Sequence, residues 1–155
     1  PVGAYGGRRE IMEMVSPVGA VYQAGTLSGN PVAMAAGIAQ LTYLKEHPEV
    51  YTKLNKTADS FFAELQKIVD ESGRGYQVNH ICSLGSMFCT TQEVYDYETA
   101  KTSDTKAYAD YCNYMQNHGI YLAPAQFEAM FSTAAHTQEP LAQTLETARN
   151  YFKNN

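Results

Sequence analysis

A long stripe of apolar residues is the clearest pattern along this chain. Apolar side chains recur every three or four positions between residues 50 and 68, at Val50, Leu54, Ala58, Phe61, Leu65 and Ile68. This spacing places them on one face of a helix. Glycine commonly follows the last residue of a helix, and Gly73 and Gly75 come next in the sequence. The pattern therefore predicts a helix that begins near residue 50 and ends before Gly73.

Four further segments have helical spacing or helix-end signals. The predicted helices cover residues 8–15, 31–47, 104–118 and 137–152. Pro31 is well placed in a first helical turn, where its missing N–H would be unpaired anyway. Asp104 and Thr137 are residue types that cap helix N-termini. His47-Pro48 ends the second of these helices, because the residue before proline avoids helical geometry.

The pattern changes after Gly75, where helical spacing gives way to short apolar runs. Two strands are predicted at 76–81 and 87–90, with a turn containing Gly85 between them, and two shorter strands at 120–122 and 131–134. Residues 93–103 are polar and read as a loop with at most one helical turn. A small sheet covered by helices is an α+β fold. We expect 1–48 to be the end of a preceding large domain and 49–155 to be a small C-terminal domain.

Composition narrows the functional classes. The net charge is −5 and no basic stripe is present, which disfavours nucleic acid as a partner. No apolar run approaches 18 residues, so we expect no membrane span. Three cysteines without CxxC spacing suit reduced thiols and a cytoplasmic protein. The four histidines form no ligand cluster, so no metal site is predicted. His136 is expected to be a buried structural histidine.

The segment 22–31 carries the strongest chemical signal. It reads Tyr-Gln-Ala-Gly-Thr-Leu-Ser-Gly-Asn-Pro and leads directly into the helix predicted from Pro31. Backbone N–H groups at a helix N-terminus bind anions, and glycines allow a phosphate to approach closely. An alternative is that Thr26 and Ser28 only cap the helix.

Four motifs together resemble the glutamate-1-semialdehyde aminomutases, which are class III enzymes dependent on pyridoxal 5'-phosphate (PLP). They are residues 1–9, 22–31, 119–124 with 126–129, and 134–137. The resemblance implies fold-type I architecture, with a large α/β domain and a small C-terminal domain, and a homodimer. It also implies isomerisation of the small molecule glutamate-1-semialdehyde to 5-aminolevulinate for tetrapyrrole (porphyrin) biosynthesis.

The resemblance also assigns roles to single residues. Thr26 would contact the PLP phosphate of the partner subunit, with Gly25 as a close-approach position and Tyr22 as a wall of the neighbouring site. Glu128 would recognise the substrate amine, although an exposed loop acid is the plainer interpretation. No arginine occurs between Arg74 and Arg149, where related aminotransferases use one to hold a substrate carboxylate. A carboxylate at 128 would instead attract an amine.

None of the lysines has the desolvated setting that a PLP-binding lysine needs. The family places that lysine shortly before the segment that starts this sequence. We therefore expect this chain to be the C-terminal part of the enzyme, inactive alone. Two alternatives remain open: a class III aminotransferase acting on another amine, and a non-catalytic interaction module.

Overall fold

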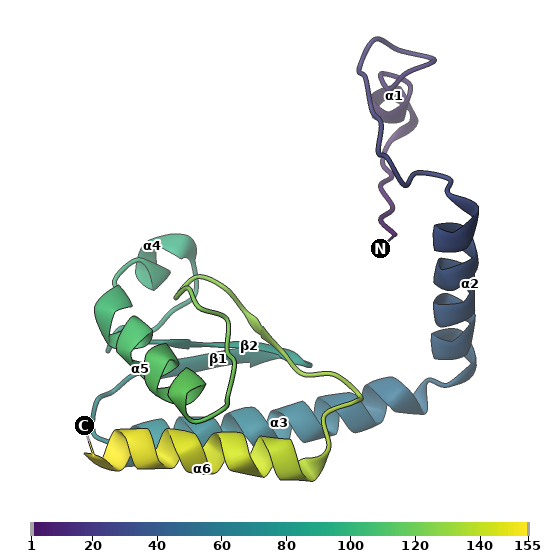
Figure 1. Ribbon diagram of the computed structural model, residues 1–155. Coiled ribbons are helices and arrows are strands. Elements are labelled where there is room, and N and C mark those ends of the chain that lie inside the picture. The colour runs from purple at the N-terminus through teal and green to yellow at the C-terminus, as the bar shows by residue number, and fades with distance from the viewer. Residues whose placement is uncertain (1, 155) are drawn as a thin grey trace. The chain divides into compact units, whose positions relative to one another are not determined.

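The computed structural model describes residues 2–154 and has an α+β fold, as predicted. The chain divides into two compact units, Pro1–Pro48 and Glu49–Asn155, each described below by itself. The first unit contains α1 (Arg9–Met12) and α2 (Pro31–Glu46), which Figure 1 labels. The second contains, in chain order, α3 (Glu49–Glu71), β1 (Gln77–Ile81), β2 (Leu84–Phe88), α4 (Tyr97–Ala100), α5 (Thr105–Asn117), β3 (Met130–Phe131) and α6 (Gln138–Asn154).

The first unit consists of a short helix, a closed loop and one long helix. Helix α1 is shorter than the predicted 8–15, because the backbone after it folds back on itself. Val15 forms a bridge with Val21, and the Ser16 N–H donates to the Val21 carbonyl at 2.8 Å. Helix α2 has no buried residue, although apolar side chains occupy all its sides. A helix that is apolar all round is normally buried.

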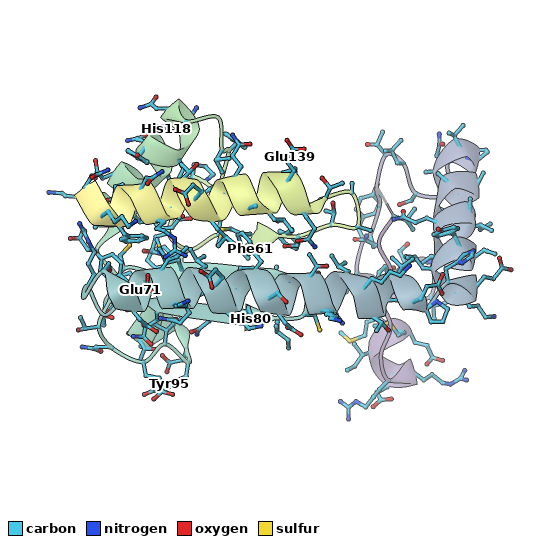
Figure 2. All side chains as sticks on the ribbon, turned by 90° about the horizontal axis from the view of Figure 1, so that it is seen from below. Phe61, Glu71, His80, Tyr95, His118 and Glu139 are labelled. Carbon is cyan, nitrogen blue, oxygen red and sulfur yellow. The ribbon has the colours of Figure 1, made fainter. Side chains whose placement is uncertain are left out.

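The second unit is built on an antiparallel sheet with strand order β1-β2-β3. Helices α3 and α6 run side by side along the sheet, and Figure 2 shows Phe61 of α3 between them. The predicted apolar stripe faces the core, since Ala58, Phe61, Leu65 and Ile68 are buried. Arg149 of α6 forms ion pairs with Glu64 and Glu71 of α3.

The β1–β2 hairpin turns earlier than the sequence suggested. Ile81 pairs with Leu84, so Cys82 and Ser83 form the turn, and Gly85 lies inside β2. A Cβ atom at Gly85 would come within 2.5 Å of the Phe62 ring, which is 1% exposed. The glycine is therefore required for the close approach of α3 to the sheet, and the prediction that it marks a turn is wrong.

The predicted strand at 120–122 is absent from the described structure. Gly119 has a φ of +82° and ends α5, and the Ile120 N–H donates to the Met115 carbonyl at 2.9 Å. The Gly119 N–H donates to the Gln116 carbonyl, which completes a Schellman cap. Ile120 packs against the core through this cap instead of joining the sheet. The other predicted helices and strands are confirmed with shifted ends, and Asp104 caps α5 by accepting from Lys106 and Ala107.

Amide exchange should separate α2 from the helices of the second unit. In the purified chain we expect the amides of 31–46 to exchange through local openings of low free energy, because no α2 side chain is buried. Exchange in α3 and α6 should approach the global unfolding limit, since both helices contribute to the core. Hydrogen exchange read by mass spectrometry checks this. Equal protection in α2 and α6 would contradict it.

Candidate functional site

The loop before α2 contains three of the predicted site residues. Tyr22, Gly25 and Thr26 are all exposed, and Tyr22 has 83% of its surface accessible. Two overlapping turns shape the loop: the Ser28 N–H donates to the Gly25 carbonyl at 2.9 Å, and the Asn30 N–H donates to the Leu27 carbonyl at 3.1 Å. A Cβ at residue 25 would lie 2.8 Å from the Ser28 hydroxyl, so glycine keeps this loop open.

The donors available to an anion differ from those that the sequence suggested. Asn30 caps α2, and its Oδ1 accepts from the N–H groups of Val32 and Ala33 at 3.0 and 3.1 Å. The first turn of the helix is therefore already satisfied by its own cap. Within residues 2–154, neither the backbone N–H nor the hydroxyl of Thr26 has a hydrogen-bond partner. These donors in the turn remain available to a phosphate, and Thr26 does not cap the helix.

Glu128 lies in the second unit, at the edge of a cavity of about 600 Å³. The cavity lies between the segment 119–136 and helices α3 and α6, and its walls include Phe61, Leu122 and Met130. Among the described residues that line it, Glu128 is the only acidic one, and none is lysine or arginine. Its carboxylate is exposed and has no partner in residues 2–154. The cavity therefore presents one anionic group within mostly apolar walls.

His136 also lines this cavity, but it is exposed, so the prediction of a buried histidine is wrong. Its Nδ1 accepts a hydrogen bond from the Thr133 N–H at 3.0 Å, which closes a local turn at the surface. Gln126, which the sequence analysis used only as part of a motif, is buried two residues before Glu128. Glu128 and the loop 22–30 belong to different units, so each part of the candidate site is described within its own unit.

Other reactive side chains are poor candidates for catalysis. All seven lysines are exposed; Lys67 forms an ion pair with Glu64 of the same helix, and Lys101, the residue after α4, pairs with Glu98 of that helix. Burial raises the pKa of the Cys89 thiol to about 12, so it stays protonated at neutral pH. Among residues 2–154, no cluster of three or more His, Cys, Asp or Glu could hold a metal ion. None of the helices described has the length and apolar character needed to cross a membrane.

Comparisons with known proteins identify relatives along almost the whole chain. The sequence pattern of the family Aminotransferase class-III matches residues 1–149. Glutamate-1-semialdehyde 2,1-aminomutase 1 of Lachnoclostridium phytofermentans is 58% identical over 153 residues, which is 99% of this chain and 36% of that protein. The chain thus spans about a third of the length of the curated relatives it matches.

Solved structures share the fold at low sequence identity. A β-phenylalanine aminotransferase from Variovorax paradoxus superimposes with a TM-score of 0.79 at 23% identity, over 96% of this chain and 34% of that one. A transaminase solved with PLP bound gives a TM-score of 0.73 at 20% identity, over 95% of this chain and 33% of that one.

Proposed function

This chain belongs to the class-III aminotransferase family, and from that premise we propose that it is the C-terminal part of a PLP-dependent glutamate-1-semialdehyde 2,1-aminomutase. The complete enzyme would convert glutamate-1-semialdehyde to 5-aminolevulinate for porphyrin synthesis. The observation that carries this substrate choice is the cavity beside Glu128, which has one carboxylate and no lysine or arginine among its described lining residues. The 58% identity to a named aminomutase supports the same reaction.

The residues of the loop before α2 fit a phosphate. Thr26 offers an N–H and a hydroxyl that have no partner among the described residues, and Gly25 keeps the approach open. Hydrogen bonds from such donors to a charged phosphate are about twice as strong as neutral ones. We propose that Gly25 and Thr26 hold the PLP phosphate of a partner subunit, and that Tyr22 forms a wall of that neighbouring site. When bound, PLP supplies the electron sink for the rearrangement.

Glu128 would select the substrate by charge. A carboxylate in a pocket without cationic side chains attracts an ammonium group and repels a second carboxylate. An aminomutase moves an amino group within one molecule, so its active site has to recognise amines. A transaminase that acts on 2-oxoglutarate needs a cationic side chain to bind the extra carboxylate of that substrate. Glu128 would therefore orient the amine end of the substrate and exclude dicarboxylic acids.

Helix α2 supports the proposed assembly. Val32, Ile38 and Leu41 are 77%, 67% and 66% exposed. Apolar residues also occupy the other sides of the helix, so we expect other parts of the complete enzyme to bury α2. We propose that residues 1–48 belong to the large PLP-binding domain, that 49–155 form the small domain, and that the enzyme is a homodimer. The cysteines Cys82, Cys89 and Cys112 are all free, which supports a cytoplasmic location.

A chimeric holoenzyme tests the proposal directly. In it, this chain replaces the matching segment of the Lachnoclostridium phytofermentans relative, and the purified protein is loaded with PLP. We expect the chimera to form 5-aminolevulinate from glutamate-1-semialdehyde and to show no transamination of 2-oxoglutarate. Transamination of another amine without aminomutase activity would favour the alternative aminotransferase, and a folded chimera that binds PLP with neither activity would contradict the proposal.

The isolated chain should not attach PLP covalently. We expect that incubation with PLP, borohydride reduction and peptide mapping will find no stoichiometrically labelled lysine, because all seven lysines are exposed and none lies in the desolvated setting that a PLP-binding lysine needs. The chimeric holoenzyme, treated in the same way, should carry one label outside this chain. A single labelled lysine within the chain, accompanied by turnover, would contradict the proposal that the reactive lysine lies elsewhere.

A further inference from the structure

Gln126 is a buried polar side chain, and both of its amide atoms bind the backbone of β2 or the residue just after it. Only 3% of the residue is exposed. Its Nε2 donates to the Met87 carbonyl at 2.7 Å, and its Oε1 accepts from the Cys89 N–H at 3.2 Å. Buried polar groups are hydrogen-bonded in stable proteins, and here one side chain satisfies two backbone groups. Residue 126 is thus fixed to the sheet at two points.

The Gln126 amide takes the place of a neighbouring strand at this edge. Strand β3 pairs with β2 only at Leu84 and Gly85, and in the described part of the chain no strand continues this pairing beside Met87 or Cys89. Both residues are almost fully buried, so an unpaired N–H or C=O there would be costly. A glutamine amide carries both a donor and an acceptor, and it completes the edge as a peptide group would.

Glu128 follows two residues later in a turn that is also tied to β2. The Glu128 N–H donates to the Ala125 carbonyl at 3.0 Å, and the Ser86 hydroxyl donates to the Glu128 carbonyl at 3.4 Å. The carboxylate itself has no partner in residues 2–154 that could hold it in place. Its position is therefore set by the anchored backbone around it, and Gln126 is the buried part of that anchor.

We propose that Gln126 is a positioning residue for substrate recognition, which acts by holding the Glu128 turn against the edge of β2. This rests on the proposed role of Glu128 as the group that binds the substrate amine. A displacement of about 1 Å in a substrate-binding group can lower activity by about a hundredfold. Loss of the Gln126 anchor should therefore reduce activity through Glu128, while the contacts of Thr26 with PLP stay unchanged.

A double-mutant cycle in the chimeric holoenzyme tests this role. Gln126→Met keeps the side-chain length and removes both hydrogen bonds. We expect it to lower kcat/KM for glutamate-1-semialdehyde by about tenfold to a hundredfold, with an unchanged PLP dissociation constant. In the Glu128→Gln background, we expect Gln126→Met to lower kcat/KM by less than threefold, because the carboxylate that Gln126 positions is already absent. A purely structural residue would lower activity by the same factor in both backgrounds.

Gln66 provides a matched control at the opposite edge of the β1–β2 pair. Its Oε1 accepts from the Val78 N–H at 2.7 Å, and its Nε2 donates to the Tyr76 carbonyl at 3.3 Å and to Asp70 Oδ1 at 2.7 Å. Gln66→Met therefore removes comparable side-chain bonds to the sheet backbone from a residue that, within residues 2–154, forms no hydrogen bond with the 125–128 turn. We expect kcat/KM to stay within twofold of the parent. If Gln126→Met does not fold, Gln126→Leu, which also removes both hydrogen bonds and adds no charge, is tested in the same double-mutant cycle.

The outcomes separate this inference from the proposed function. If Glu128→Gln lowers kcat/KM and Gln126→Met leaves it within twofold, the positioning role is overturned and the proposed function stands. Equal losses in both backgrounds, or failure of both Gln126 variants to fold, also overturn it, because Gln126 would then serve the fold alone. If Glu128→Gln itself has no effect, the site assignment fails and the positioning role fails with it.

Discussion

Glu128→Gln in the chimeric holoenzyme is expected to lower kcat/KM for glutamate-1-semialdehyde by about tenfold to a thousandfold, or ~1.4 to 4 kcal/mol. The change removes one negative charge and keeps the side-chain shape. A carboxylate ~4 Å from an ammonium group contributes about 4 kcal/mol at an effective dielectric of ~20, which sets the upper end of the range. Because Glu128 is exposed in the described structure, solvent screening favours the lower part of that range.

Two variants control this experiment. Thr26→Ala should weaken PLP retention and have a smaller effect on turnover once PLP is saturating, because its free donors lie in the proposed phosphate loop. Glu146→Gln removes an exposed carboxylate from α6, outside the residues that line the cavity, and should leave kcat/KM within twofold. Steady-state kinetics and PLP titration measure the three proteins side by side. If Glu128→Gln also stays within twofold, Glu128 is an ordinary loop acid.

Phe62→Ala should give the largest loss of stability among single changes in the second unit. The ring is 1% exposed, lies edge-on to Phe61 at 5.2 Å between centroids, and stacks on His80 at 5.1 Å. Truncation of a buried phenylalanine to alanine costs about 3–5 kcal/mol, because packing contacts are lost and a cavity remains. The free energy of unfolding of a domain of this size is about 5–15 kcal/mol, so the substitution would remove much of it.

Urea unfolding of the purified chain, followed by far-ultraviolet circular dichroism, measures this loss. Tyr51→Ala is the control, because Tyr51 is an aromatic residue of the same helix with 51% of its surface exposed. We expect it to change the unfolding free energy by less than about 0.5 kcal/mol. A loss below about 1 kcal/mol in Phe62→Ala would show that the site collapses without a cavity, contrary to this expectation.

Most helices of this chain could be predicted from sequence because their signals are local. The stripe that contains Ala58 and Leu65 repeats with the period of a helix, and Asp104 is a strong cap in any context. The prediction of a strand at 120–122 was wrong, because apolar residues after a glycine are compatible with either a strand or a Schellman cap. Only the packing of Ile120 onto the core decides between them.

The candidate site was less accessible to sequence reasoning than the fold. Thr26 and Glu128 were found through family motifs, since a loop hydroxyl and a loop acid have no periodic signal of their own. The role of Asn30 as the helix cap, and the bonds from Gln126 to the β2 backbone, depend on which backbone groups lack partners after folding. Which backbone groups lack hydrogen-bond partners is decided by the tertiary structure, so no local pattern in the sequence reveals these bonds.

The close approach of Phe62 to Gly85 has a consequence for how this sequence can change over time. A side chain at residue 85 would meet the ring of Phe62, whereas a smaller residue at 62 would leave a void beside Gly85. Neither position can vary freely alone, but an enlarged residue 85 with a reduced residue 62 would conserve the shared volume. Divergence at this point of the core should therefore proceed as paired substitutions, and homologous sequences should show covariation between the two positions.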